Sequence, residues 1–364
     1  MKILACFLAL LLGAAGSSAP RTGPGQAPQA GPERAQRAAG PSQPVRLAPK
    51  FAPGNLLRYQ MEFRTTTEGH RTGVVEDPQG PSKLELTWAA LIRVEVLNVP
   101  PAPGQAAPDA SARPANPPGA TTPSVTRLRA TYEKSAATAR SDTYDPEGST
   151  IAEQYRKLEG RSIEFTLDAE GKVGEVSGLQ GIFPDEKAAS AAREWFGQLA
   201  MGASLPSGGI VPGQKWSSEQ PASLAPIAGL VWRAESTYLR NERCRPAGGA
   251  EAPGADPLAA GQACAVILTR FEVTQPRPPR DPTPEDYRKR GLRTAGRWSG
   301  SGESLAYVML GTGWVVSITQ SGTEEMDVTV STADGASGVR YAGRVRSQSQ
   351  ITLLPDSLAA PAPR

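Results

Sequence analysis

The longest stretch of period-two hydrophobic alternation covers residues 84–96, and it constrains the fold more than any other feature. Every second residue there is apolar. A period of two is typical of a strand with one buried face and one solvent-facing face. Shorter alternation recurs over 57–63, 163–167 and 305–309. The chain is therefore predicted to be mainly β, with antiparallel strands. Because 83–97 exceeds the usual strand length, we expect a bend or a β-bulge in it.

Three stretches of the first half resemble stretches of the second half in the same order. Residues 54–58 resemble 229–233, and 93–96 resemble 270–273. The third match has identical spacing and joins Ile163, Phe165, Leu167, Gly171, Val173 and Val176 to Leu305, Tyr307, Met309, Gly313, Val315 and Ile318. We therefore predict two repeated, curved antiparallel β-units, at 51–182 (with a Pro-rich loop at 99–123) and 203–354.

One or two helices are expected to pack on this sheet. Pro184, Asp185 and Glu186 provide a favourable helix start, because proline fits the first turn and acidic groups suit its positive end. This linking helix spans 183–202 and is expected to place Trp195 on the sheet. A shorter helix is expected over 150–158.

The N-terminus has the layout of a secretory signal peptide over residues 1–19. Lys2 precedes the apolar run 3–12, and small residues follow it. Cleavage of a lipoprotein before Cys6 is the alternative. Two further segments, 20–50 and 355–364, are rich in Pro and Ala and are predicted to be disordered. The mature chain has no apolar run long enough to span a membrane, so we predict a secreted or periplasmic protein without a transmembrane segment.

Removal of the signal peptide leaves Cys244 and Cys264 as the remaining cysteine pair. Each lies beside a strand-like run, with the Gly-, Ala- and Pro-rich stretch 246–262 between them. In an exported chain this arrangement favours a disulfide. Two free thiols in a reducing compartment are the alternative.

Several kinds of chemistry are disfavoured by composition. The chain has one histidine, His70, so sites with two imidazoles are excluded, and three cysteines cannot form a four-cysteine zinc site. We interpret His70 as part of an exposed hairpin turn, 68–73. With 39 basic and 36 acidic residues the net charge is +3, too balanced for a nucleic-acid binder. No nucleotide-binding loop is present, and we predict no cofactor and no metal. The tryptophans are expected to be core anchors: Trp88, Trp195, Trp216, Trp232, Trp298 and Trp314.

Carboxylate chemistry needs no histidine, so a two-carboxylate hydrolase stays open as a minor alternative. The candidate residues are Glu62, Glu95, Glu164 and Glu272. Glu95 and Glu272 each follow an arginine by two residues, at Arg93 and Arg270. Because the neighbouring apolar residues take the opposite face, we expect these four side chains to point away from the core. Two other acidic groups, 142–147 and 324–327, are interpreted as a solvated loop and a charged hairpin end.

A sequence pattern in the middle of the chain resembles a known family. The hairpin 163–178 is followed by Leu205-Pro206 and by Pro212-Gly213 before Trp216, and Gly300-x-Gly302 precedes an alternating strand. The glycines of this last motif are interpreted as a bulge or a close strand approach. Together these motifs resemble those of exported bacterial β-rich proteins of unknown function, over 54–354. The resemblance implies fold and compartment and carries over no site residues.

These observations favour a non-catalytic, exported module that binds another protein or an envelope component through a sheet face or edge. The alternative is a carrier of a hydrophobic ligand or lipid. In that case the apolar faces of 84–96 and 163–167 would line a cavity opposite the Trp195 helix.

Overall fold

The computed structural model describes residues 44–52, 54–75, 80–97, 125–142, 152–168, 171–178, 205–206, 208–222, 225–244 and 263–354. The predicted signal peptide, the 20–43 part of the arm, the Pro-rich loop, the linking helix, the 246–262 stretch and the 355–364 tail lie outside these residues. None of the helices in the described part combines the length and the apolar character that a membrane crossing requires.

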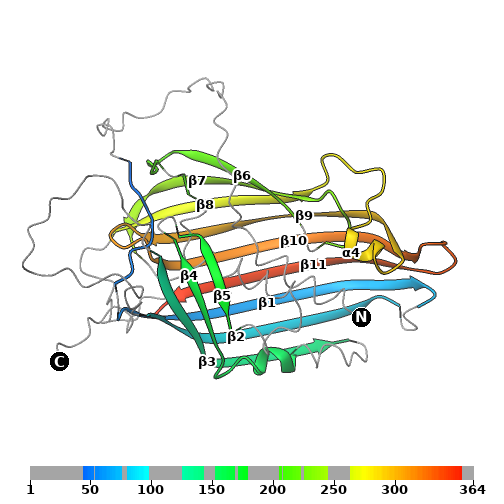
Figure 1. Cartoon of the computed structure of the whole chain (residues 1–364), viewed down its shortest axis with the longest axis horizontal. Coiled ribbons are helices and arrows are strands. Elements are labelled where there is room, and N and C mark those ends of the chain that lie inside the picture. Colours follow the sequence, from blue (N-terminus) through cyan, green and yellow to red (C-terminus); the bar gives the residue numbers. More distant parts are fainter. Residues whose placement is uncertain are drawn as a thin grey trace, which may run out of the picture.

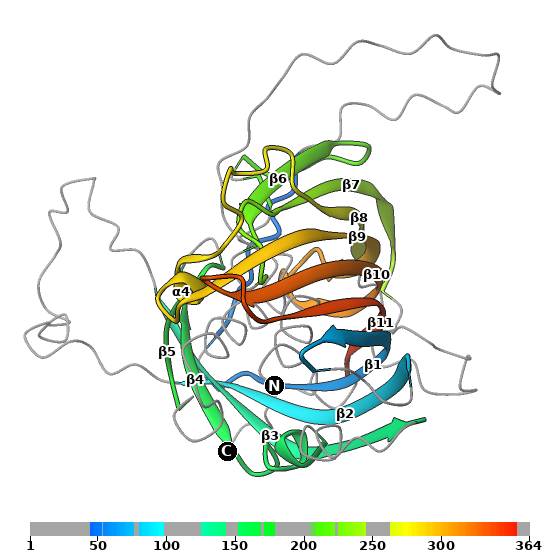
Figure 2. The same ribbon diagram turned by 90° about the vertical axis from the view of Figure 1, so that its right-hand side faces the viewer.

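Eleven strands of the described residues form a single antiparallel sheet (Figure 1). They are β1 (Leu56–Gly73), β2 (Ser82–Val96), β3 (Thr126–Ser141), β4 (Ser162–Leu167), β5 (Val173–Ser177), β6 (Lys215–Pro221), β7 (Val231–Arg243), β8 (Ala263–Thr274), β9 (Leu292–Met309), β10 (Val315–Thr332) and β11 (Gly338–Leu353). The order across the sheet is β5-β4-β3-β2-β1-β11-β10-β9-β8-β7-β6. The mainly β prediction is confirmed, and Figure 2 shows that the sheet is strongly curved.

The two predicted units share one ladder. β1 pairs with β11 along its length, from Tyr59 opposite Leu353 to Gly73 opposite Val339. The first and last of the described strands therefore lie side by side in the middle of the sheet. The sheet ends instead at β5 and β6, which follow one another among the described strands.

One face of the sheet, which we call the core face, carries the apolar alternation. Leu57, Tyr59, Met61 and Phe63 of β1 are at most 5% exposed, and even-numbered residues 86–96 of β2 are buried beside them. Ile163, Phe165 and Leu167 extend the same cluster. Burial of these side chains is the main driving force for the sheet. The opposite face, which we call the polar face, carries the charged residues between them.

In the C-terminal half of β9, the residues that face the core differ from the prediction. Leu305, Tyr307 and Met309 were expected to face the core, but Ala306 and Val308 do so. Met309 and Tyr307 instead pack on the polar face in a small cluster with the disulfide. All five residues are apolar, so a period of two cannot decide between the faces. The third repeat match therefore does not hold in packing, since Ile163, Phe165 and Leu167 lie on the core face.

The expected irregularity in the long β2 run is present in its ladder with β3. Leu91 pairs with Lys134 and Ile92 with Tyr132, so Glu133 is the extra residue of a bulge on β3. The predicted short helix is present over 152–156. A second helix, α4 (Glu285–Arg288), lies in the Pro-rich stretch 275–292, whose composition is unfavourable for a core; it nevertheless buries Tyr287.

The segment before β1 packs on the turn between β9 and β10. Lys50 N–H donates to the carbonyl oxygen of Thr312 at 2.7 Å. Trp314 Nε1–H donates to the Lys50 carbonyl oxygen at 2.9 Å, and Phe51 stacks on the Trp314 ring. In Figure 1 this blue segment crosses the strand ends on the left side of the sheet. The segment around Lys50 and Phe51 is thereby fixed to the fold before β1 begins.

Candidate functional site

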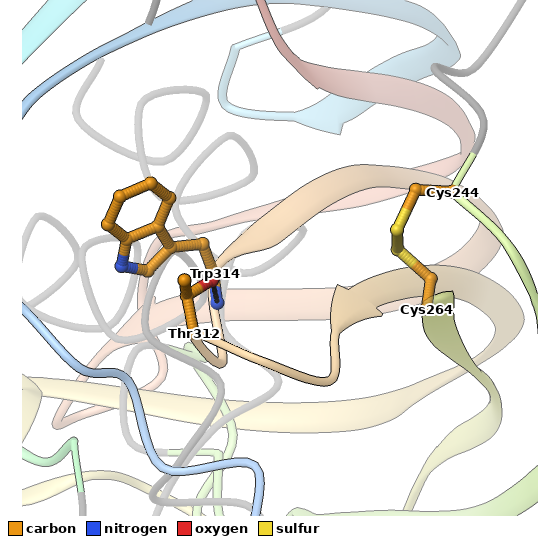
Figure 3. The surroundings of a disulfide bond; sticks show 4 residues. All are labelled: Cys244, Cys264, Thr312 and Trp314. Atoms are coloured by element: carbon orange, nitrogen blue, oxygen red, sulfur yellow. Dashed lines mark hydrogen bonds between the residues drawn. A yellow bond between two sulfur atoms is a disulfide. The ribbon is translucent and has the colours of Figure 1, made fainter. Parts of the chain in front are cut away.

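The predicted disulfide is present. Cys244 follows β7 and Cys264 lies in β8, with 20 residues of sequence separation and a Cα–Cα distance of 4.9 Å (Figure 3). Both cysteines are buried with Met309 and Val316 on the polar face. Because disulfides persist in oxidising compartments, this bond favours a location outside the cytoplasm.

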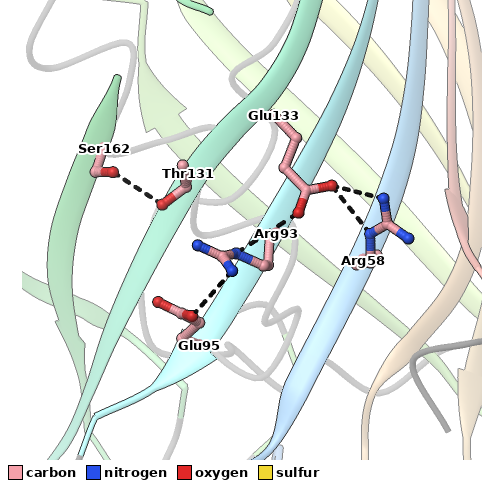
Figure 4. A network of polar contacts seen from close by, with 6 residues as sticks. All are labelled: Arg58, Arg93, Glu95, Thr131, Glu133 and Ser162. Carbon is pink, nitrogen blue, oxygen red and sulfur yellow. Dashed lines mark hydrogen bonds and ion pairs between the residues drawn. The ribbon is translucent and has the colours of Figure 1, made fainter. Parts of the chain in front are cut away.

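The polar face carries ion pairs that run across the strands. Arg58 donates from Nε and Nη2 to one carboxylate oxygen of Glu133, at 3.0 and 2.7 Å (Figure 4). Arg93 lies between Glu133 and Glu95, at 3.6 and 3.5 Å. Glu133 is the bulge residue, so the bulge directs a carboxylate toward arginines of two neighbouring strands. These partly exposed pairs fit a structural role.

The four glutamates proposed for hydrolysis lie on this polar face, each beside a basic or amide group. Glu95 contacts Arg93, and Glu272 contacts Arg233 at 3.5 Å. Glu164 accepts from Arg127 and Arg129 at 2.6 and 2.7 Å, and hydrogen bonding from Arg129 leads the causes that lower its pKa. Glu62 accepts from the Gln60 amide. As expected, Arg93, Glu95, Arg270 and Glu272 lie opposite the core face.

Two interpretations of turns were wrong. His70 lies within β1, opposite Ala342 of β11, because the long β11 ladder extends β1 to Gly73. The close approach needs glycine, since a Cβ at Gly69 would lie 2.8 Å from the Ala342 carbonyl oxygen. Residues 324–327 lie inside β10, where β9 and β11 pair with both sides. Of the 142–147 group, the structure describes only Asp142.

Two shallow grooves cross the polar face between rows of side chains. The first, of about 760 Å³, touches seven strands from β3 to β8. The second, of about 970 Å³, adjoins it over β1, β11, β10, β9, β8 and β7. Glu303 and Gln348 line both grooves. The grooves are lined mainly by polar-face residues, whereas the carrier alternative places its ligand against the apolar faces of 84–96 and 163–167, which lie on the opposite face.

The second half of β3 has no strand partner among the described residues on the side away from β2. β4 pairs with β3 only from Thr126 to Thr131, whereas β2 continues along β3 to Ser141. Asp142 N–H donates to the Lys83 carbonyl oxygen of β2, and Ser135 N–H donates away from β2 to Glu159. Since backbone direction alternates along a strand, the even residues after the bulge bond β2 and the odd residues face the open side.

The backbone N–H and C=O groups of Ala137 and Ala139 therefore point to the side of β3 away from β2, where Ala137 is 7% exposed and Ala139 is partly exposed. No described residue hydrogen-bonds these groups. A small pocket of about 370 Å³ lies beside them, lined by residues 135–139, Ala152 and Arg156. Arg156 is exposed, and in the described part of the chain it makes no ion pair. The sequence did not predict this edge, although four uncharged small residues at 136–139 were a signal of it.

Ser135 joins this edge to the short helix. Its hydroxyl donates to the Tyr155 carbonyl oxygen at 2.6 Å and accepts from Trp88 Nε1 at 2.9 Å. Trp88 also packs on the Tyr155 ring, with centroids 5.1 Å apart. The helix that carries Arg156 is thus anchored to the core face, and the open edge begins directly after its anchor.

A carboxyl group is buried on the core face of β10. Glu324 is 3% exposed, and its Oε2 accepts from Trp298 Nε1 at 3.1 Å. Its Oε1 has no partner among the described residues. Burial raises the pKa of Glu324 to about 7, and the Trp298 hydrogen bond opposes the shift. The sequence analysis missed this position. The apolar residues Met326 and Val328, at a spacing of two after Glu324, were the signal that could have placed Glu324 on the core face.

The tryptophan prediction holds for Trp88, Trp232, Trp298 and Trp314, which are 3–9% exposed. Trp216 is partly buried against the same cluster, and Trp195 lies outside the described residues. Within the described ranges, no group of three or more His, Cys, Asp and Glu residues is arranged to hold a metal ion.

Comparisons with known proteins do not identify a family. No protein-family description matches the chain, and no curated protein matches it. Among solved structures, an outer membrane channel from Pseudomonas putida F1 matches with 9% identity, over 87% of this chain and 100% of that chain. The TM-score of 0.17 is too low for this likeness to carry an argument.

Proposed function

We propose that this protein is an exported, non-catalytic module of the cell envelope that binds a partner polypeptide by strand addition at the open edge of β3. The observation that carries the proposal is that the backbone groups of Ala137 and Ala139 on this side of β3 have no hydrogen-bond partner among the described residues. An extended peptide that pairs with such an edge gains main-chain hydrogen bonds, while side-chain pockets give specificity.

Exposed edges are usually protected in proteins by charge, proline or short length. β6, one end of this sheet, carries Lys215 and Pro221 and is seven residues long. β5, the other end, is five residues long. The open part of β3 has uncharged residues from 135 to 139 and reaches its first charge at Arg140. Because this edge lacks such protection, it is a better candidate for a binding role than the edges at β5 and β6.

The pocket beside the edge indicates what partner fits. Arg156 supplies a positive charge that the described contacts leave unneutralised. The alanines at 136, 137 and 139 leave room for side chains of the added strand. An acidic side chain of the partner would form a charge-assisted hydrogen bond with the guanidinium group. The favoured partner is therefore an extended β-type segment that is uncharged apart from one acidic residue.

The test measures binding of two synthetic heptapeptides by titration calorimetry. Both alternate Val and Thr, and one has Asp at the centre where the other has Lys. We expect the wild-type protein to bind the Asp peptide more tightly. A137P removes the edge N–H and should abolish binding of both peptides. Unchanged binding by A137P, or no binding of the Asp peptide to the wild-type protein, would overturn the proposal.

Matched variants separate the edge from the charge. R156E should reverse the preference to the Lys peptide, whereas K157E, directly after the helix and outside the pocket lining, should keep the wild-type preference. A139P, nearer the strand end, repeats the edge test if A137P does not fold. Equal effects of R156E and K157E would contradict the role given to Arg156.

Export rests on the signal-like layout of residues 1–19 and on the buried disulfide. We propose cleavage after the small residues at 13–19. Mass spectrometry of the protein secreted from its host or recovered from the periplasm should give a chain that lacks this segment. An intact Met1 on the mature protein would contradict it.

We also infer that the halves of the sheet derive from one β-unit. β1 and β7 each begin after a glycine of positive φ, Gly54 and Gly229. Each strand pairs antiparallel with a next strand that ends in the similar stretches 93–96 and 270–273. Sequences of diverged relatives test this inference, because the two halves should align more clearly in some of them.

A further inference from the structure

Glu324 lies in a row of core-face residues that crosses the sheet. Val273 of β8, Gly300 of β9, Glu324 of β10, Val345 of β11 and Thr67 of β1 are direct neighbours in register. Apart from Glu324, this row has no ionisable side chain. The row therefore surrounds the carboxyl group with apolar and small neutral groups.

Gly300 makes the position of Glu324 possible. A Cβ on Gly300 would lie 2.7 Å from Glu324 Cγ, so the side chain lies flat over the glycine backbone. Trp298, on the same strand, donates the hydrogen bond to Oε2. The Glu324 side chain thus packs on the Gly300 backbone and accepts one hydrogen bond, from Trp298. In the described structure no cation is bonded to its carboxyl group.

The described charged groups near this position lie on the other face. Glu325 pairs with Arg344, and Asp327 pairs with Arg340 at 2.7 Å, both on the polar face. On the core face, β9 presents Trp298, Gly300 and Gly302, and β11 presents Gly343, Val345 and Ser347. Among the described residues of the core face, the titratable or charged side chains nearest to Glu324 along the strands are Tyr341 and Arg71. Tyr341 lies on β11 two core-face positions beyond Val345, the residue opposite Glu324, and it pairs with Arg71 of β1.

We propose that the protonation state of Glu324 controls the packing of β9 on β10 at the core face. This packing is tight while the carboxyl group is neutral and loosens when the group ionises, and we call this arrangement the lock. A neutral carboxyl tolerates the apolar row, whereas a carboxylate there is removed from bulk water and has no counter-charge bonded to it among the described residues. Ionisation would weaken the packing of Trp298 and of β9 on β10. The proposal goes beyond the binding function, because it concerns the opposite face of the sheet.

The direction of the pH effect follows from linkage. Burial raises the pKa of Glu324 in the folded chain to about 7, from the ordinary value of 4.5 that a glutamate has when exposed to water. A raised folded-state pKa gives stability that is fully present below the unfolded pKa and is lost as pH rises through the folded pKa. The expected rise in the unfolding equilibrium constant between pH 4.5 and 8 is at most about 300-fold, from this difference in pKa.

The test compares urea unfolding of three full-length proteins between pH 4.5 and 8. E324Q keeps an acceptor for Trp298 but cannot ionise, so it should lose the part of the pH dependence that Glu324 causes. E325Q, next in sequence but on the polar face, should keep the wild-type dependence over pH 6–8. Equal pH dependence of wild type and E324Q over this range would overturn the proposal.

An infrared measurement on the wild-type protein tests the lock without a variant that has to fold. A buried neutral carboxyl group should give a C=O band at pH 5.5 that disappears above pH 8, together with a change in tryptophan fluorescence. A carboxyl band that is absent at pH 5.5, or that disappears without any change in fluorescence, would contradict the lock.

Discussion

Trp298 donates its indole N–H to Glu324 across the β9–β10 ladder, at 3.1 Å, and this is the hydrogen bond that the structure shows to the Glu324 carboxyl group. W298F keeps most of the ring but removes the donor. We expect a loss of about 1–3 kcal/mol in the free energy of unfolding at neutral pH, because a buried acceptor is left unsatisfied. We also expect a further rise in the pKa of Glu324. Urea unfolding at pH 5 and 8 checks both, and an unchanged stability at pH 8 would contradict the role of this bond.

The glycines of the Gly300-x-Gly302 motif are required by close packing. A Cβ on Gly302 would overlap the Ser321 carbonyl oxygen and the Phe271 ring. G302A should therefore destabilise the protein by about 1–3 kcal/mol. G311A is the matched control, because nothing lies within 4 Å of a Cβ at that position. Equal thermal midpoints for the two variants would show that the Phe271 ring does not lie over Gly302.

The disulfide should stabilise the fold against unfolding. Its 20-residue separation corresponds to about 3 kcal/mol in the chain-entropy model. The double variant C244S/C264S should lose roughly this free energy of unfolding. Thiol labelling of the denatured, unreduced mature protein should detect neither cysteine. Labelling of both residues would contradict the bond.

The ion pairs of Glu164 should have the opposite pH dependence to Glu324. Hydrogen bonds from Arg129 and Arg127 lower the pKa of Glu164, so its contribution is present above the ordinary pKa and is lost as pH falls. E164Q should cost no more than about 1 kcal/mol at pH 7, because the arginines are half exposed. At pH 3 the cost should be smaller. An equal cost at both pH values would contradict the pairing.

Sequence alternation was sufficient where apolar residues occupied one face alone. It predicted the strands around 57–63, 84–96 and 163–167 and their buried side chains. It failed at 305–309, where both faces are apolar because the disulfide cluster covers the second face. It also failed at His70 and Glu324, because neighbouring strands, which local sequence does not specify, extend β1 and β10 through polar residues.

The candidate binding edge was unpredictable for a related reason. Whether Ala137 and Ala139 are paired depends on where β4 begins, at Ser162, which is 25 and 23 residues later in the chain. Their direction depends on the bulge at Glu133, which changes the side toward which the odd residues point. Sequence composition showed only that 136–139 was uncharged. Register and strand length decided the rest.

Amide hydrogen exchange resolved at residues 136–139 tests the central claim most directly. In the free protein, the amides of Ala137 and Ala139 should exchange fast, whereas those of Ala136 and Thr138, which bond β2, should exchange slowly. Saturation with the Asp heptapeptide should slow Ala137 and Ala139 and leave the other two unchanged. Slow exchange of Ala137 and Ala139 in the free protein, or no slowing with the peptide, would contradict strand addition at this edge.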